Sequence, residues 1–308
     1  MRNDTGLTRR DFCRQMAAAG MGLAVGASRP ARCEEPSFRL RYTLASCMYG
    51  KEPLSRIVPE VIQCGAESID LWPKSHGDQR EQLDAMGDEA FRRLLAEHKV
   101  RLAMTTRFDL GPYGLDKEIR KVQELGGTMI VCGSGPVEGT TDKQRIQNFI
   151  ERIQPHVEVA RQHEIILAIE NHDSWAVSSP DSLRYFAKMA KSDHLGIALA
   201  PYHLPQDEDL LCCLIEDLGP KLVHFYAWQH GAGCSNEQPL EQELLQLPGR
   251  GPLDFRPLVA SLRTINFSGL TEIFMHPFPR GRPIRDKVED VTLEIVQARN
   301  YLNTCLSD

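Results

Sequence analysis

The chain has 308 residues, of which 42% are hydrophobic and 25% are charged, and its formal net charge is −6. This length fits one large domain better than two ordinary ones. A mean hydropathy of −0.34 excludes an integral membrane protein. The acidic balance argues against a nucleic-acid partner, because such a protein needs a basic stripe to neutralise phosphates.

The first 27 residues have the pattern of an export signal. Arg9 and Arg10 precede a mildly apolar stretch of small residues, 16–27, which is too short to span a membrane stably. The pattern resembles a twin-arginine signal, which implies export to the periplasm or beyond; the alternative is an ordinary amphipathic helix. We expect a signal peptide at 1–27, a prepeptide or linker at 28–38 and the mature domain at 39–308, with no integral membrane segment once the signal is removed.

Short apolar runs alternate with amphipathic helical patterns through the rest of the chain. Strands are expected at 40–46, 68–72, 101–105, 128–133, 165–169, 195–200, 221–223 and 270–271, and helical faces near 54–62, 90–95, 146–160, 183–189, 210–218, 255–262 and 288–302, with one further helix ending before Gly126. Pro59 leaves the continuity of the first helix open. Strict alternation forces parallel strands and right-handed crossovers, so we predict an α/β fold, a single-domain (β/α)8 TIM barrel. The alternative, an open doubly wound sheet, lacks a GxGxxG motif after the first strand.

Polar side chains end four consecutive strands of this predicted barrel. Glu170 follows the fifth run, His203 the sixth, His224 the seventh and Glu272 the eighth. One such residue alone is more often a solvated loop residue or a satisfied buried group. Strand ends of a parallel barrel converge on one rim, so four in succession predict a site there.

Two carboxylates and two imidazoles on one rim suit a divalent metal of the Mn, Co, Mg or Zn type. Such a metal would polarise a carbonyl or bind the enediolate formed when a proton leaves the neighbouring carbon. Carboxylates on opposite walls can exchange that proton.

The order and spacing of these residues, together with the segment 247–255 and the run 269–272, resemble the xylose-isomerase-like barrel superfamily of sugar isomerases and epimerases. In its ketose 3-epimerase branch, residues matching Glu170, His224 and Glu272 bind a metal with an Asp that ends the sixth strand. Ala200 stands at the position of that Asp and cannot ligate. The resemblance therefore implies a rebuilt metal site, a weaker one or none. We expect a rebuilt site, with spare imidazoles recruited.

The predicted metal ligands are Glu170, His203, His224 and Glu272, and Glu170 and Glu272 are the predicted catalytic pair. The resemblance implies a metal-dependent sugar isomerase or epimerase that abstracts a proton next to a carbonyl. One alternative is a keto-sugar or keto-glycoside lyase on the same site. Another is a non-catalytic periplasmic carbohydrate-binding barrel, in which Ala200 replaces a metal ligand that catalysis would need. The expected partner is a small carbohydrate; the sequence leaves the sugar, the metal and the oligomeric state open, a homo-oligomer included.

Two loops on the same rim are expected to contact the substrate. The connection 228–252 after the seventh strand is long, which favours a functional lid or a tolerated surface insertion. The loop after the eighth strand places Arg280, Arg282 and Arg285 near the two carboxylates; the alternative is that they pair with outer acidic residues. The residues expected to bind substrate are His172, Trp228, His230, Arg250, His276, Arg280 and Arg282.

Overall fold

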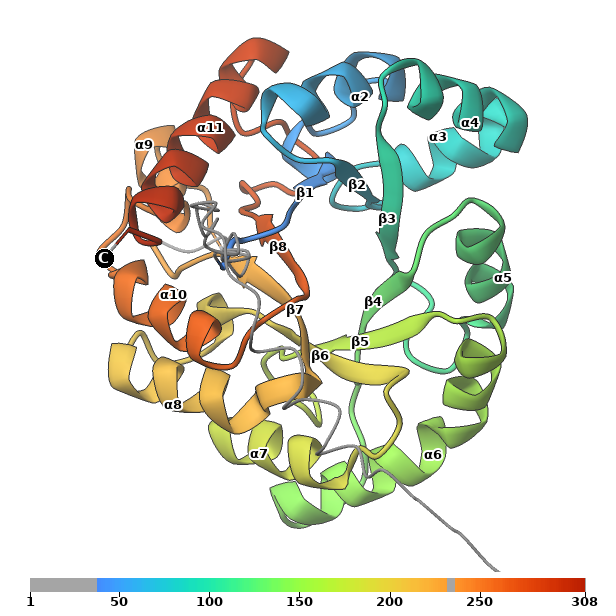
Figure 1. The fold of residues 1–308 in the computed structure, drawn as a ribbon, viewed down its shortest axis with the longest axis vertical. Coiled ribbons are helices and arrows are strands. Elements are labelled where there is room, and N and C mark those ends of the chain that lie inside the picture. Colours follow the sequence, from blue (N-terminus) through green and yellow to red (C-terminus); the bar gives the residue numbers. More distant parts are fainter. Residues whose placement is uncertain (1–37, 232–235, 308) are drawn as a thin grey trace, which may run out of the picture. The chain divides into compact units, whose positions relative to one another are not determined.

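Eight parallel strands close into a barrel in the computed structural model of this chain, which describes residues 38–231 and 236–307 (Figure 1). The strands are β1 Tyr42–Ala45, β2 Ser68–Leu71, β3 Arg101–Thr106, β4 Met129–Gly133, β5 Ile166–Glu170, β6 Leu195–Leu199, β7 Leu222–Ala227 and β8 Leu270–Ile273. They pair in sequence order, and β8 closes the ring by pairing with β1. The predicted (β/α)8 barrel is confirmed, and the open sheet is wrong. The predicted signal peptide and residues 28–37 of the prepeptide lie outside the described residues.

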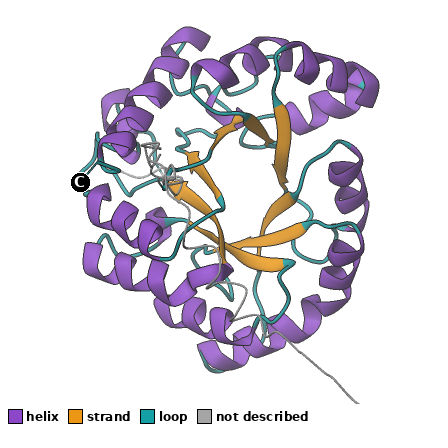
Figure 2. Ribbon diagram, viewed as in Figure 1, coloured by secondary structure: helices purple, strands orange, loops and turns teal. Residues whose placement is uncertain are grey.

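The helices form a layer around the outside of the strands (Figure 2). They are α2 Leu54–Gln63, α3 Gln79–Met86, α4 Asp88–Glu97, α5 Asp116–Glu124, α6 Asp142–Gln162, α7 Pro180–Met189, α8 Glu208–Leu218, α9 Leu240–Glu243, α10 Phe255–Thr264 and α11 Val288–Thr304. Each longer helix buries one apolar face, as amphipathic periodicity requires. Within the described residues, no helix is long and apolar enough to cross a membrane.

Local sequence explains where individual helices begin and end. Helix α7 begins with a capping box, in which the side chain of Ser179 accepts from the backbone N–H of Ser182 while the Ser182 hydroxyl accepts from that of Ser179. Helix α2 runs through Pro59 without interruption. After α2, Gly65 adopts φ +71°, and a Cβ there would lie 1.4 Å from a guanidinium nitrogen of Arg299. Glycine adopts this conformation without strain, and a larger residue would also have to displace the Arg299 side chain.

The seventh strand differs from its prediction. Phe225, Tyr226 and Ala227 continue β7, so His224 is its third residue and not its end. His224 pairs with Ala198 of β6 in the register of the barrel wall and is fully buried. The predicted strand was too short because the polar imidazole of His224 was interpreted as the end of an apolar run. The correction moves His224 from the rim into the barrel interior.

Candidate functional site

A cavity of about 200 Å³ opens at the carboxyl ends of the strands. Its lining comprises Trp72, His76, Phe108, Glu170, His172, Trp175, His203, Trp228, Phe274, His276 and Arg280. Each of these residues ends a strand or follows one, which is why side chains far apart in sequence meet here. Most of the wall consists of aromatic rings and imidazoles, and Glu170 is the only acidic side chain that lines it within the described chain. We call this space the inner cavity.

Glu170 and His203 face each other in the wall of the inner cavity. Glu170 is the last residue of β5 and is 3% exposed. His203 ends a short 3-10 helix after β6, and its Nε2 atom lies 3.5 Å from Oε1 of Glu170. The His203 ring also lies against His172, with 4.3 Å between ring centroids. A carboxylate next to an imidazole at a cavity wall is an arrangement that can move protons.

His224 and Glu272 form a second pair, buried beneath the inner cavity. Both are fully buried, and Nε2 of His224 lies 3.0 Å from Oε2 of Glu272. Burial lowers the pKa of His224 to about 3 and raises the pKa of Glu272 well above its usual range. Burial therefore favours the uncharged form of each member of the pair.

Two stacked rings separate this buried pair from the cavity. Trp72 and Phe274 lie with centroids 4.8 Å apart and planes 12° from parallel, and both line the inner cavity, whereas Glu272 does not. The indole Nε1 of Trp72 donates to Oε1 of Glu272 at 3.3 Å. Of the two carboxylates predicted to act together, only Glu170 lines the cavity, although, besides burial, its charge still contributes to the raised pKa of Glu272.

Asp70 is a buried acid that the sequence prediction missed. It lies in β2 and is fully buried, and the Thr106 hydroxyl donates to its Oδ2 atom at 2.6 Å. Burial, followed by the nearby charge of Glu272, raises the pKa of Asp70 well above its usual range. The available signal was an acid between Ile69 and Leu71 in a short strand, two residues before Trp72.

The predicted metal ligands do not converge on one point. They form the two pairs described above, and no group of three or more His, Cys, Asp or Glu side chains in residues 38–231 and 236–307 is arranged to hold a metal ion. Ala200 is fully buried, and its backbone N–H and C=O are both bonded to the side-chain amide of Asn171, at 2.8 and 3.0 Å. The donors therefore do not fit the four-ligand metal site expected from the sequence.

Four of the seven predicted substrate-binding residues line the inner cavity: His172, Trp228, His276 and Arg280. His230 lines an adjacent cavity. Arg250 lies elsewhere, with its guanidinium 2.5 Å from Glu294 of α11. The guanidinium of Arg282 lies 3.8 Å from Glu237 and lines neither cavity. The structure therefore does not place Arg250 and Arg282 in the substrate site, because each forms an ion pair with an acidic residue outside it.

The connection after β7 supports the aromatic wall. It includes α9 and a 3-10 helix, Leu244–Gln246. The buried side chain of Gln246 accepts from the indole N–H of Trp228 at 2.9 Å and donates to the carbonyls of Glu243 and His276 at 3.1 and 3.2 Å. Gln246 thus fixes one wall of the cavity to the loops after β7 and β8. The sequence did not predict this role, since a single amide side chain in a loop belongs to no periodic or motif pattern.

Arg280 carries the only fixed positive charge in the lining. It is exposed, and it has no ion pair among the described residues. Burial, and secondly the charge of Arg280, lowers the pKa of His76 to about 3. Burial, and secondly His76, lowers the pKa of His276 well below its usual range. These two imidazoles stay neutral near pH 7, so Arg280 is the one cationic side chain in this lining among the described residues.

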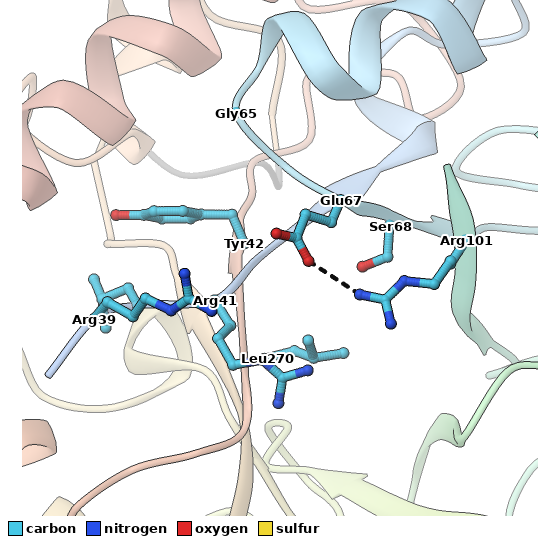
Figure 3. Close-up of a pocket in the computed structure, with 9 residues that line it drawn as sticks. Arg39, Arg41, Tyr42, Gly65, Glu67, Ser68, Arg101 and Leu270 are labelled. Carbon is cyan, nitrogen blue, oxygen red and sulfur yellow. Dashed lines mark hydrogen bonds and ion pairs between the residues drawn. The ribbon is translucent and has the colours of Figure 1, made fainter. Parts of the chain in front are cut away.

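Another cavity, of about 130 Å³, lies at the opposite, amino-terminal ends of β1, β2, β3 and β8 (Figure 3). Its charged residues include Arg39, Arg41 and Arg101, and Arg101 forms an ion pair with Glu67 at 3.0 Å. The guanidinium of Arg41 donates to the carbonyl of Ser268 at 2.9 Å. None of the strand-end residues described above lines this cavity. The active sites of (β/α)8 barrels lie at the opposite face, at the carboxyl ends of the strands.

The fold and the rim cavity define a (β/α)8 barrel with a small-molecule site at the carboxyl ends of its strands. Residues 58–291 match the xylose isomerase-like TIM barrel family, and the chain belongs to that family. No curated protein sequence matches it significantly.

Solved structures share the fold at low sequence identity. The IOLI protein, solved with a bound zinc atom, has a TM-score of 0.68 at 13% identity, over 87% of this chain and 98% of its own. The 3-keto-D-glucoside 4-epimerase of E. coli has a TM-score of 0.61 at 14% identity, over 85% and 100%. The probable 3-DHS dehydratase of Bacillus anthracis has a TM-score of 0.61 at 14% identity, over 83% and 97%. At these identities the likeness establishes the fold.

Proposed function

We propose that this chain is a sugar isomerase or epimerase-like enzyme that moves a proton on the carbon next to a carbonyl. The observation that carries the proposal is Glu170, the one acidic side chain in the lining of the inner cavity, 3.5 Å from the imidazole of His203. Family membership and the fold of the E. coli epimerase support it. The aromatic lining also suits the apolar faces of a sugar ring.

In this mechanism Glu170 takes the proton from the carbon beside the carbonyl. The electron pair of the broken C–H bond moves to the carbonyl oxygen, and the imidazole of His203 donates a hydrogen bond or a proton to that oxygen. Arg280, at the rim of the cavity, binds the substrate in both the ground state and the transition state. In isomerisation, a proton then returns to the former carbonyl carbon while the hydroxyl on the neighbouring carbon loses its proton and becomes the new carbonyl. In epimerisation, a proton from solvent returns to the original carbon on its opposite face and the oxygen gives up the proton it received.

Glu272 takes a positioning role in this proposal. It is fully buried beneath Trp72 and Phe274 and accepts the indole N–H of Trp72. We assign no step to a divalent metal, because the proposed donors form two separate pairs.

A lyase acting on keto-sugars or keto-glycosides is the second candidate. The same enediolate can expel a β-substituent, and His203 lines both the inner cavity and its neighbour, so it can reach a leaving group. Proton NMR of keto-sugar and keto-glycoside reactions in D2O separates the two. Deuterium incorporation without loss of a substituent supports the isomerase; a released aglycone supports the lyase.

A non-catalytic carbohydrate-binding barrel is the candidate of another class. Five aromatic residues in the lining, Trp72, Phe108, Trp175, Trp228 and Phe274, could bind a sugar without transforming it. This reading requires that no deuterium enters any bound sugar. It also requires that Glu170→Gln leaves sugar affinity unchanged.

We also propose that the chain is exported by the twin-arginine route. The support is the paired arginines Arg9 and Arg10 before a stretch of small apolar residues. Fractionation of cells that express the full chain tests this, with Arg9→Lys/Arg10→Lys as the variant. Retention of the variant and export of the wild type are expected.

A further inference from the structure

A second cavity adjoins the inner one on the same rim. It measures about 360 Å³ and is lined by His172, Asp173, Tyr202, His203, Leu204, His230 and Arg280. We call it the outer cavity. His172, His203 and Arg280 line both spaces, so the two meet along these three side chains.

We propose that the outer cavity is a binding site for a second sugar unit, so that the enzyme acts on a disaccharide or larger glycoside in preference to a free monosaccharide. The inference rests on the proposed function and adds the substrate class. Small-molecule sites usually measure about 300–1,000 Å³. The inner cavity alone falls below that range at about 200 Å³, and with the outer cavity it falls inside.

The two cavities differ in chemistry. Each has one carboxylate and shares Arg280. The inner one surrounds Glu170 with five aromatic side chains, whereas the outer one places Asp173 beside the rings of Tyr202 and His230. Tyr202 stacks on Trp228, with centroids 3.9 Å apart and planes 7° from parallel, and His230 meets its ring at 66°. Neighbouring side chains of opposite charge suit a neutral, hydroxyl-rich group. A phosphate or carboxylate here would lie beside the charge of Asp173 as well as that of Arg280.

The shared boundary fits a glycosidic linkage. His203 stands on this boundary and lies 3.5 Å from Glu170, which lines only the inner cavity. A sugar whose reacting carbon is beside Glu170 therefore extends toward the outer cavity past the His203 imidazole. The second ring then lies between Tyr202, Asp173 and His230.

Isothermal titration calorimetry on the purified chain tests the inference. The ligands are the monosaccharides D-glucose and D-fructose, the disaccharides cellobiose, maltose and sucrose, and 4-nitrophenyl β-D-glucoside. We expect at least one disaccharide to bind at least 10-fold more tightly than any monosaccharide. Asp173→Ala and His230→Ala, both at exposed positions, should reduce that ratio at least fivefold. Asp193→Ala is the matched control, since this exposed aspartate lies before β6 at the opposite end of the barrel.

Each outcome decides the question. Equal affinity for monosaccharides and disaccharides overturns the second sugar site. So does a loss of affinity in Asp173→Ala and His230→Ala that is the same for monosaccharides and for disaccharides. Either result leaves the proposed function standing. Tighter binding of the nitrophenyl glucoside than of every disaccharide overturns the assignment of a sugar to the outer cavity. If none of these sugars binds, the second sugar site is overturned, while the proposed function is decided separately by deuterium exchange in D2O. Circular dichroism of both variants verifies that they fold.

Discussion

The indole Nε1 of Trp72 donates a hydrogen bond to Oε1 of Glu272 at 3.3 Å. Trp72 faces the inner cavity, while Glu272 is fully buried behind it. The carboxyl group thus holds a cavity-lining ring in place, and the ring in turn shields the carboxyl group from the cavity. Glu170, by contrast, is open to the cavity. This difference separates the roles of two acids that look equivalent in the sequence.

Trp72→Phe and Glu272→Gln should affect stability unequally. Trp72→Phe removes the donor and leaves a buried oxygen without it, which costs about 1–3 kcal/mol. Glu272→Gln keeps an acceptor, and burial already favours the uncharged form of this side chain, so we expect a change below about 1 kcal/mol. Urea unfolding of both variants gives the two losses. A loss in Trp72→Phe no larger than that in Glu272→Gln would contradict the hydrogen bond between these side chains.

Asp70→Asn should stabilise the protein increasingly as pH rises. Burial raises the pKa of Asp70, so the folded chain keeps a proton that the unfolded chain releases near its ordinary pKa of about 3.9. The stability that this proton contributes is complete below that pH and is lost as pH rises. Asn cannot titrate but still accepts from Thr106. We expect the gain in free energy of unfolding of the variant over wild type to be larger at pH 8 than at pH 4.

Unfolding curves in urea at both pH values give this difference. A stability difference between Asp70→Asn and wild type that is the same at pH 4 and pH 8 would show that Asp70 ionises freely in the folded chain. Asp193→Ala serves as the control, because that side chain is fully exposed.

The fold was predictable because periodicity reports on burial. Apolar runs such as 165–169 lie in strands covered on both faces, and the positions 146, 149, 150, 153 and 157 recur on the buried face of α6. The secondary-structure prediction failed where polar residues are buried or where a helix buries few residues. His224 looked like a strand end, yet β7 continues for three residues beyond it. Helix α3 was missed, since only Gln79, Arg80 and Leu83 of it are buried.

Arg280→Ala should raise KM more than it lowers kcat. Arg280 lines both cavities, so it should contact the substrate equally in the ground state and in the transition state. Arg282→Ala is the matched control, because that guanidinium points toward Glu237 and lines neither cavity. Steady-state kinetics of the two variants would contradict the assignment if Arg282→Ala raised KM as much as Arg280→Ala.

Gln246→Leu should destabilise the fold and weaken sugar binding together. The substitution removes one accepted and two donated hydrogen bonds in a buried position. Each is worth about 1 kcal/mol, so we expect a loss of about 2–4 kcal/mol. Freed from Gln246, the Trp228 ring should also give a red-shifted fluorescence emission. Gln147→Leu, on the exposed face of α6, is the control and should change neither quantity.

The candidate site was predictable only in part. Parallel strands deliver their ends to one rim, and this rule placed Glu170, His203, His276 and Arg280 together. Depth within the barrel was not predictable, because it depends on strand length and register. The sequence therefore predicted that Glu272 and Glu170 lie at the same depth in the barrel. In the structure, Trp72 and Phe274 separate Glu272 from the cavity. Arg250 was misassigned because its ion pair with Glu294 joins segments far apart in the chain.

The most direct test of the central claim is the rate at which solvent deuterium enters the carbon next to the carbonyl, followed by NMR in D2O. With the keto-sugar or keto-glycoside that the wild type turns over fastest, Glu170→Gln should lower this rate by about 10²–10⁴, the usual contribution of a general base. Glu272→Gln should lower it less, and thermal melting should show both variants folded. An exchange rate in Glu170→Gln equal to that of the wild type would contradict the assignment of Glu170 as the base.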